Sequence, residues 1–183
     1  MKKHFLSSKG FTLIELLVVI AVLGVLAATV LVAIDPVEQL ARGRDTGMKS
    51  AIAEIGRAMT AYGTSRNGLY LNPAIGNITF LTDLKNAGEI KTLPTRSIAI
   101  AGCSLTTAGK SLQNDFCYST DATATSFAVY ATPESKSVKN LCPTEALPIA
   151  WYVYSSVDGR AGVVCTAAVT AEPEVDTQTF VGP

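Results

Sequence analysis

An apolar run near the N-terminus is the feature that most limits how this chain can fold. Residues 11 to 34 read FTLIELLVVIAVLGVLAATVLVAI, with Glu15 as the only charged side chain. About 20 apolar residues in a helix suffice to cross the hydrocarbon core of a bilayer, so the run predicts a transmembrane helix. Lys2, Lys3 and Lys9 precede it, which predicts a cytoplasmic N-terminus and an exported remainder.

A cleaved secretory signal peptide is the alternative for this segment. The apolar part of such a peptide typically has about 7–15 residues, which is shorter than the run seen here, although Ala27-Ala28 resembles a small-residue cleavage site. The length favours a helix that is retained in the mature protein.

The composition argues against several functions. The 183 residues include 15 basic and 15 acidic side chains, so the formal net charge is zero and nothing predicts a strong attraction to nucleic acid. The only histidine, His4, precedes the apolar run, and loss of a leader would leave no imidazole for a Ser-His or Cys-His pair. No phosphate loop or metal-ligand spacing occurs. We expect a protein that is not an enzyme, with no cofactor and no metal.

The four cysteines, Cys103, Cys117, Cys142 and Cys165, predict disulfides. None belongs to a CxxC pair, which argues against zinc binding and thioredoxin chemistry. An even number in an exported segment suggests two bonds, while four buried thiols are the alternative. We favour the pairs Cys103–Cys117 and Cys142–Cys165 because each closes a local loop. The other two pairings stay open.

Glu15 needs a counterpart, because an ionised side chain in a bilayer centre costs about 2.5–3.5 kcal/mol, and less near a helix end. Cleavage between Gly10 and Phe11 would give Phe11 an α-amine that is cationic near neutral pH. That amine lies about one turn from Glu15 in its own helix, and it could also meet Glu15 of a staggered neighbour. Such an ion pair would set the register between helices. The alternative is a protonated or snorkelling glutamate without a role.

The string Gly10-Phe11-Thr12-Leu13-Ile14-Glu15 follows a short basic leader and opens the apolar run. It resembles the class III signal of type IV pilins and of type II secretion pseudopilins. The resemblance implies that a prepilin peptidase cuts after Gly10 and methylates the amine of Phe11, and that Glu15 acts in assembly. It also implies an inner-membrane assembly platform and copies of the chain in a helical filament as partners. The subunit would lie in the bilayer first and in an extracellular pilus afterwards.

The apolar helix is predicted to continue beyond a break. Asp35-Pro36 predicts a kink or a short non-helical stretch, with Asp35 as an N-cap and Pro36 as the first residue of the next segment. Apolar residues then recur at helical spacing up to Tyr62, which predicts an amphipathic helix. We interpret Arg42, Arg44 and Asp45 on its polar side as salt-bridge partners between subunits or as a solvated face.

The remainder predicts an α+β fold, in which the long helix packs on a small antiparallel sheet. Asp158-Gly159 predicts a hairpin turn, and one face of the sheet should pack on the apolar face of residues 48 to 62. The strand candidates are 116–118, 126–131, 149–154 and 162–165. The expected divisions are a leader at 1–10, a transmembrane or filament-core helix at 11–34, its amphipathic continuation at 35–63, a connecting loop with a short helix at 64–96, a disulfide-bonded sheet head at 97–171 and a mobile tail at 172–183.

These features predict a structural subunit, a pilin, of a type IV pilus-like filament. A pseudopilin of a type II secretion system is the alternative, because the same signal and helix serve both. A membrane-anchored extracytoplasmic domain is the third possibility. Adhesion, motility and DNA uptake are not separated by the sequence.

Overall fold

The structure is a computed structural model, and it describes residues 10–74, 76–96, 103, 105–106, 108–142, 146–167, 172–173 and 175–181. The chain divides into two compact units, Met1–Gln39 and Leu40–Pro183, which are treated separately below. The expected leader lies outside the described residues, apart from Gly10.

The first unit contains α1 (Leu13–Ile34), whose side chains are apolar apart from Glu15 and Thr29. Its segment Leu13–Leu31 has a mean hydropathy of 2.8 and none of it is buried within the chain. By length and composition this helix can cross a membrane. Since water is a poor solvent for such a surface, lipid or other protein must cover it.

A change of backbone direction at Asp35 ends α1. Asp35 has φ 41°, in the left-handed region, and α2 (Pro36–Thr64) begins at the next residue. The Asp35 side chain accepts a hydrogen bond from the backbone N–H of Glu38 at 3.3 Å. Pro36 has no N–H to donate to the preceding turn, which is why the helical hydrogen-bond ladder stops here and restarts.

The second unit is a head built on an antiparallel sheet. Each strand pairs with the next one along the chain, so the order in the sheet is β1-β2-β3-β4-β5-β6. Gly159 has φ 63° in the turn between β4 and β5, where Asp158-Gly159 predicted a hairpin. The strands are β1 (Lys110–Gln113), β2 (Phe116–Thr120), β3 (Phe127–Ala131), β4 (Ile149–Ser155), β5 (Arg160–Thr166) and β6 (Phe180–Val181).

Two edge strands, β1 and β6, were not predicted. They have four and two residues and carry little apolar alternation. Each is a strand because it pairs with a neighbouring strand, and that pairing depends on the tertiary structure rather than on local propensity.

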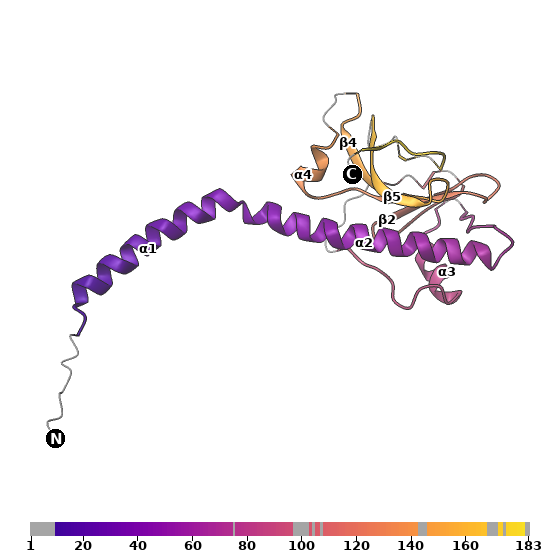
Figure 1. Cartoon of the computed structure of the whole chain (residues 1–183). Coiled ribbons are helices and arrows are strands. Elements are labelled where there is room, and N and C mark those ends of the chain that lie inside the picture. The colour runs from indigo at the N-terminus through magenta and orange to yellow at the C-terminus, as the bar shows by residue number, and fades with distance from the viewer. Residues whose placement is uncertain are drawn as a thin grey trace, which may run out of the picture. The chain divides into compact units, whose positions relative to one another are not determined.

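The helix α2 packs along one face of the sheet (Figure 1). This face was predicted from the apolar spacing of residues 48 to 62. The helix comes very close to β4, because a Cβ added at Gly56 would lie 2.3 Å from Cγ of Tyr154. The core between helix and sheet includes Met48, Ile52, Ile55, Met59, Phe116, Tyr118, Phe127 and Val129.

A short helix, α3 (Phe80–Asn86), lies beside β1 and is capped from it. The Gln113 side chain accepts hydrogen bonds from the N–H groups of Leu81 at 2.7 Å and Thr82 at 3.1 Å. It also donates to the Thr82 hydroxyl at 2.6 Å. The preceding residue, Thr79, makes no side-chain cap, so the sheet supplies the cap that α3 needs.

The other face of the sheet carries a second apolar cluster of Cys117, Ala128, Tyr130, Trp151, Val153 and Val164, with Phe180 packed against it. We expected a mobile tail at 172–183; among its described residues, Phe180 and Val181 form β6. Glu172 is buried, and it accepts hydrogen bonds from Tyr130 Oη at 3.0 Å and from Lys110 Nζ. Covering this apolar face and pairing β6 with β5 stabilise a segment whose composition alone suggested disorder.

Two disulfides join parts of the head, and they are the pairs that we favoured. Cys103 is bonded to Cys117 on β2, with Cα atoms 5.8 Å apart. Cys142, which follows α4 (Lys136–Lys139), is bonded to Cys165 on β5, with Cα atoms 5.6 Å apart. Each therefore ties an irregular segment to the sheet.

Candidate processing and assembly site

The peptide bond between Gly10 and Phe11 lies in exposed, non-helical backbone just before α1. Phe11 has 88% of its surface exposed, and nothing lies within 4 Å of a Cβ built on Gly10. A peptidase must draw an extended segment into its active site, so a bond outside the helix is accessible to one.

Thr12 and Glu15 form the N-terminal cap of α1. The Glu15 backbone N–H donates to the Thr12 hydroxyl oxygen at 3.3 Å, and the Thr12 N–H donates back to the Glu15 carboxylate at 2.9 Å. The Thr12 hydroxyl donates to the same carboxylate at 2.7 Å. This reciprocal arrangement is a capping box, which satisfies backbone donors that no helical turn can reach.

Sequence reasoning assigned Glu15 a role but gave none to Thr12. The signal was present as the spacing Thr12-Leu13-Ile14-Glu15, which fits the capping-box pattern. The cap matters for Glu15, because the Glu15 carboxylate accepts two hydrogen bonds from Thr12 in the uncleaved chain. Within the described residues it forms no ion pair. A cationic partner would therefore add to the cap and would not need to replace it.

A second group of charged residues lies in the head, where α2 meets the segment before α4. The Arg44 Nε donates to the Glu134 carboxylate at 2.6 Å. Asp45 is 3% exposed and accepts from the backbone N–H of Glu134 at 2.7 Å, from the N–H of Ser135 at 2.9 Å and from the Ser135 hydroxyl at 2.5 Å. Asp45, which we interpreted as a salt-bridge partner between subunits or as part of a solvated face, is therefore buried and hydrogen-bonded within the chain. Arg44 likewise has its ion pair within the chain.

Arg96 completes this group from the other side. Its side chain is 4% exposed, and its guanidinium lies 3.9 Å from Glu134. It also donates to the carbonyl oxygens of Thr132 at 2.9 Å and Asp115 at 3.4 Å. Burial lowers the pKa of Arg96, and the charges of Glu134 and Asp115 oppose that shift. The group stays cationic because the ordinary arginine value is so high.

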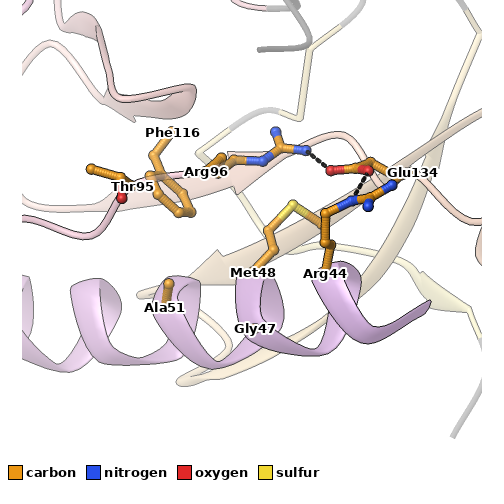
Figure 2. A pocket seen from close by; sticks show the side chains of 8 residues that line it. All are labelled: Arg44, Gly47, Met48, Ala51, Thr95, Arg96, Phe116 and Glu134. Atoms are coloured by element: carbon orange, nitrogen blue, oxygen red, sulfur yellow. Dashed lines mark hydrogen bonds and ion pairs between the residues drawn. The ribbon is translucent and has the colours of Figure 1, made fainter. Parts of the chain in front are cut away.

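Figure 2 shows Glu134 between the guanidinium groups of Arg44 and Arg96. These three residues line a cavity of about 170 Å³. The floor of the cavity is apolar and includes Met48, Ala51 and Phe116. No sequence motif signalled this pocket, because its residues come from α2, β2 and two connecting segments.

Residues 6–31 match the family model described as the prokaryotic N-terminal methylation motif. This is the class III signal of type IV pilins and pseudopilins. With the apolar helix α1 and an antiparallel sheet packed on α2, the chain has the α+β organisation of a pilin-like protein. Neither a curated protein nor a solved structure matches the chain.

Proposed function

We propose that this chain is a structural subunit of a type IV pilus-like extracellular filament. The observation that carries the proposal is α1, which the methylation motif overlaps and whose apolar segment Leu13–Leu31 is long enough to cross a membrane. A soluble monomer does not keep 22 consecutive helical residues of this kind in water. The proposed role is assembly, without catalysis and without a bound cofactor or metal.

The proposed sequence of events begins in the membrane. The basic leader stays in the cytoplasm, α1 spans the bilayer, and the head lies outside. A prepilin peptidase then cleaves between Gly10 and Phe11 and methylates the new amine. An inner-membrane assembly platform moves the subunit into the filament, where helices of other copies replace lipid around α1.

Glu15 guides the register of this assembly in our proposal. Its carboxylate already accepts hydrogen bonds from Thr12, and the cationic amine of Phe11 from the same or a neighbouring subunit adds an ion pair in an apolar medium. Charge pairs are strong where water is excluded, so copies whose Glu15 lacks an amine partner are disfavoured.

The alternative function, a pseudopilin of a type II secretion system, is supported by the same motif and the same helix. The two disulfides favour a surface pilus, because a filament subunit outside the cell gains most from crosslinks that resist unfolding. Mechanical shearing separates the two roles, since it releases a long surface filament but not a rod confined to the cell envelope.

Mass spectrometry of the sheared filament tests the proposal. The expected result is a chain that begins at an N-methylated Phe11 and dominates the fraction. A mature chain that begins at Met1, or one cut after α1, would contradict it. A correctly processed chain that stays in the envelope would favour the secretion role.

A further inference from the structure

The segment just before α3 contains a tripeptide that the proposed function does not use. Asn77-Ile78-Thr79 has the pattern N-x-S/T, in which the asparagine can accept an N-linked glycan in an exported protein. The pattern occurs once in the 183 residues. Because such tripeptides are common in proteins, the geometry of this asparagine has to decide whether it is an acceptor.

The side-chain amide of Asn77 is held in one orientation. The backbone N–H of Thr79 donates to Asn77 Oδ1 at 3.0 Å, and the hydroxyl of the buried Ser111 donates to the same oxygen at 2.8 Å. A backbone N–H can only donate, so the atom that it faces must be the amide oxygen. The other atom of the amide is therefore Nδ2, which is the atom that would bond to a sugar.

Nδ2 begins a chain of hydrogen bonds that ends on a carboxylate. It donates to the Thr79 hydroxyl oxygen at 3.1 Å, and that hydroxyl donates to the Asp83 carboxylate at 3.2 Å. Hydrogen bonds in a chain polarise one another, so the charge of Asp83 makes the Thr79 oxygen a better acceptor. This increases the electron density on an amide nitrogen that is otherwise a poor nucleophile.

The amide has room for a substituent on Nδ2. The nitrogen carries two hydrogens, and within the described part of the chain only Thr79 takes one of them. Asn77 is half-buried, but its neighbour Ile78 is 60% exposed and Gly76 is exposed with nothing within 4 Å of an added Cβ. A sugar that replaces the second hydrogen leaves the hydrogen bonds to Thr79 and Ser111 in place.

We propose that Asn77 accepts an N-linked glycan, which a membrane-bound transferase moves from a lipid-linked sugar diphosphate to the folded head. Nδ2 attacks the anomeric carbon, so an N–C bond forms while the C–O bond to the diphosphate breaks. The lipid diphosphate leaves with the electron pair of that bond, and the second hydrogen of Nδ2 leaves as a proton to a base of the transferase. The proposal rests on the part of the proposed function that places the head outside the cell membrane.

A glycan at Asn77 covers an edge of the sheet. Asn77 forms a bridge with Ser111 on β1, the first strand in the sheet order, and its carbonyl oxygen accepts from the Leu112 N–H at 3.3 Å. Exposed strand edges are templates for pairing with another chain. A hydrated sugar beside β1 blocks such pairing, so the modification limits aggregation of the exported heads.

Mass spectrometry of the chain from its native cells tests the proposal. Trypsin cuts after Arg66 and Lys85 and releases the intervening residues as one peptide. We expect this peptide to carry a glycan whose fragment masses place it on Asn77. An amidase that removes N-linked glycans should convert Asn77 to aspartate. An exported chain with this peptide unmodified, or with the glycan on another residue, would overturn the proposal.

Four variants test the acceptor pattern. Asn77→Gln and Thr79→Val should carry no glycan, whereas Thr79→Ser keeps the hydroxyl and should keep the glycan. Asn72→Gln is the matched control, because Asn72 is exposed but is followed by Pro73, which excludes it as an acceptor. Fluorescence of the buried Trp151 should show that each head is folded. A glycan on Thr79→Val, or its loss from a folded Thr79→Ser, would contradict the proposal.

Asp83→Asn tests the hydrogen-bond chain. This variant keeps the size of the side chain and one acceptor oxygen but removes the charge, so a smaller fraction of chains should carry the glycan. An unchanged fraction would overturn the role given to Asp83.

Protease digestion of spheroplasts separates failure of this proposal from failure of the proposed function. A head that is digested only after the membrane is permeabilised lies inside the cell, and the proposed function then fails. A head that is digested from outside but carries no glycan contradicts the modification alone.

Discussion

Asp45 on α2 holds Ser135, 90 residues later, through hydrogen bonds from the Ser135 N–H at 2.9 Å and the Ser135 hydroxyl at 2.5 Å. A third bond comes from the N–H of Glu134 at 2.7 Å. This single carboxylate therefore fixes the segment before α4 against the helix, next to the charged pocket.

Asp45→Ala should destabilise the head by about 3 kcal/mol, because it leaves three donors near the helix without their charged acceptor. Chemical unfolding of the full chain in detergent, followed by Trp151 fluorescence, measures the effect. Asp45→Asn keeps an acceptor oxygen, so the stability of this variant should lie between those of the wild type and Asp45→Ala. A loss below about 1 kcal/mol for Asp45→Ala would show that water replaces the carboxylate.

Gly56→Ala should destabilise the head by about 1–3 kcal/mol, as expected for overpacking. The added Cβ would lie 2.3 Å from the Tyr154 ring, so helix and sheet would have to move apart. Gly43→Ala is the matched control, since nothing lies within 4 Å of its Cβ. It should raise stability by up to about 1 kcal/mol. The same unfolding experiment measures the stability of both variants. Equal changes in stability for Gly56→Ala and Gly43→Ala would refute the close contact.

Removal of either disulfide should lower stability by about 3 kcal/mol in the loop-entropy description. The bonded cysteines are separated by 14 and 23 residues, so the two losses should be similar. The comparison uses Cys103→Ala with Cys117→Ala, and Cys142→Ala with Cys165→Ala. Thermal unfolding with and without reductant measures these losses. If reductant still lowered the stability of a variant with all four cysteines replaced by alanine, the effect would have a cause other than the disulfides.

Acid should destabilise the loop between β2 and β3 through Asp121. Burial alone would raise the pKa of Asp121, but hydrogen bonds from Thr123, Ser126 and Thr125 outweigh it and hold the pKa below its usual range. The unfolded chain, whose aspartates titrate near about 3.9, therefore takes up protons more readily than the folded one. This stabilisation is complete above the unfolded pKa and is lost as the pH falls through the folded value.

Asp121→Asn isolates that contribution. The stability difference between wild type and variant should be constant above about pH 5 and should shrink below about pH 4. Unfolding curves over this pH range measure it. A difference that does not change with pH would mean that the charge of Asp121 is not involved.

Glu15→Ala should leave export and cleavage intact but lower filament yield by at least about tenfold, the equivalent of 1.4 kcal/mol. Thr12→Val removes the hydroxyl of the cap and should weaken the start of the helix by about 1 kcal/mol, with a smaller effect on yield. Immunoblots of membrane and sheared fractions measure both variants. Normal filament yield from Glu15→Ala would refute its role in assembly.

Most residues of the candidate processing and assembly site were proposed from the sequence because they are close together in it. The apolar run, Glu15 and the break at Asp35-Pro36 lie within a short stretch, and a helix places them in a fixed order. The Thr12 cap was equally local but was overlooked. The pocket beside Arg44 was not predictable, since its walls come from segments up to 90 residues apart.

Local sequence patterns predicted the helices on either side of Asp35-Pro36 and four of the strands, because periodicity and proline chemistry act between near neighbours. Short loop closure favoured the two cysteine pairs that the structure contains, but it left the other pairings open. The edge strands β1 and β6, the burial of Glu172 and the hydrogen bonds of Asp45 to Glu134 and Ser135 could be found in the folded structure alone. These features depend on which surfaces, distant in the sequence, are buried against one another. The hydrogen-bond partner of a buried polar group can lie far away in the sequence, so a local sequence pattern does not predict it.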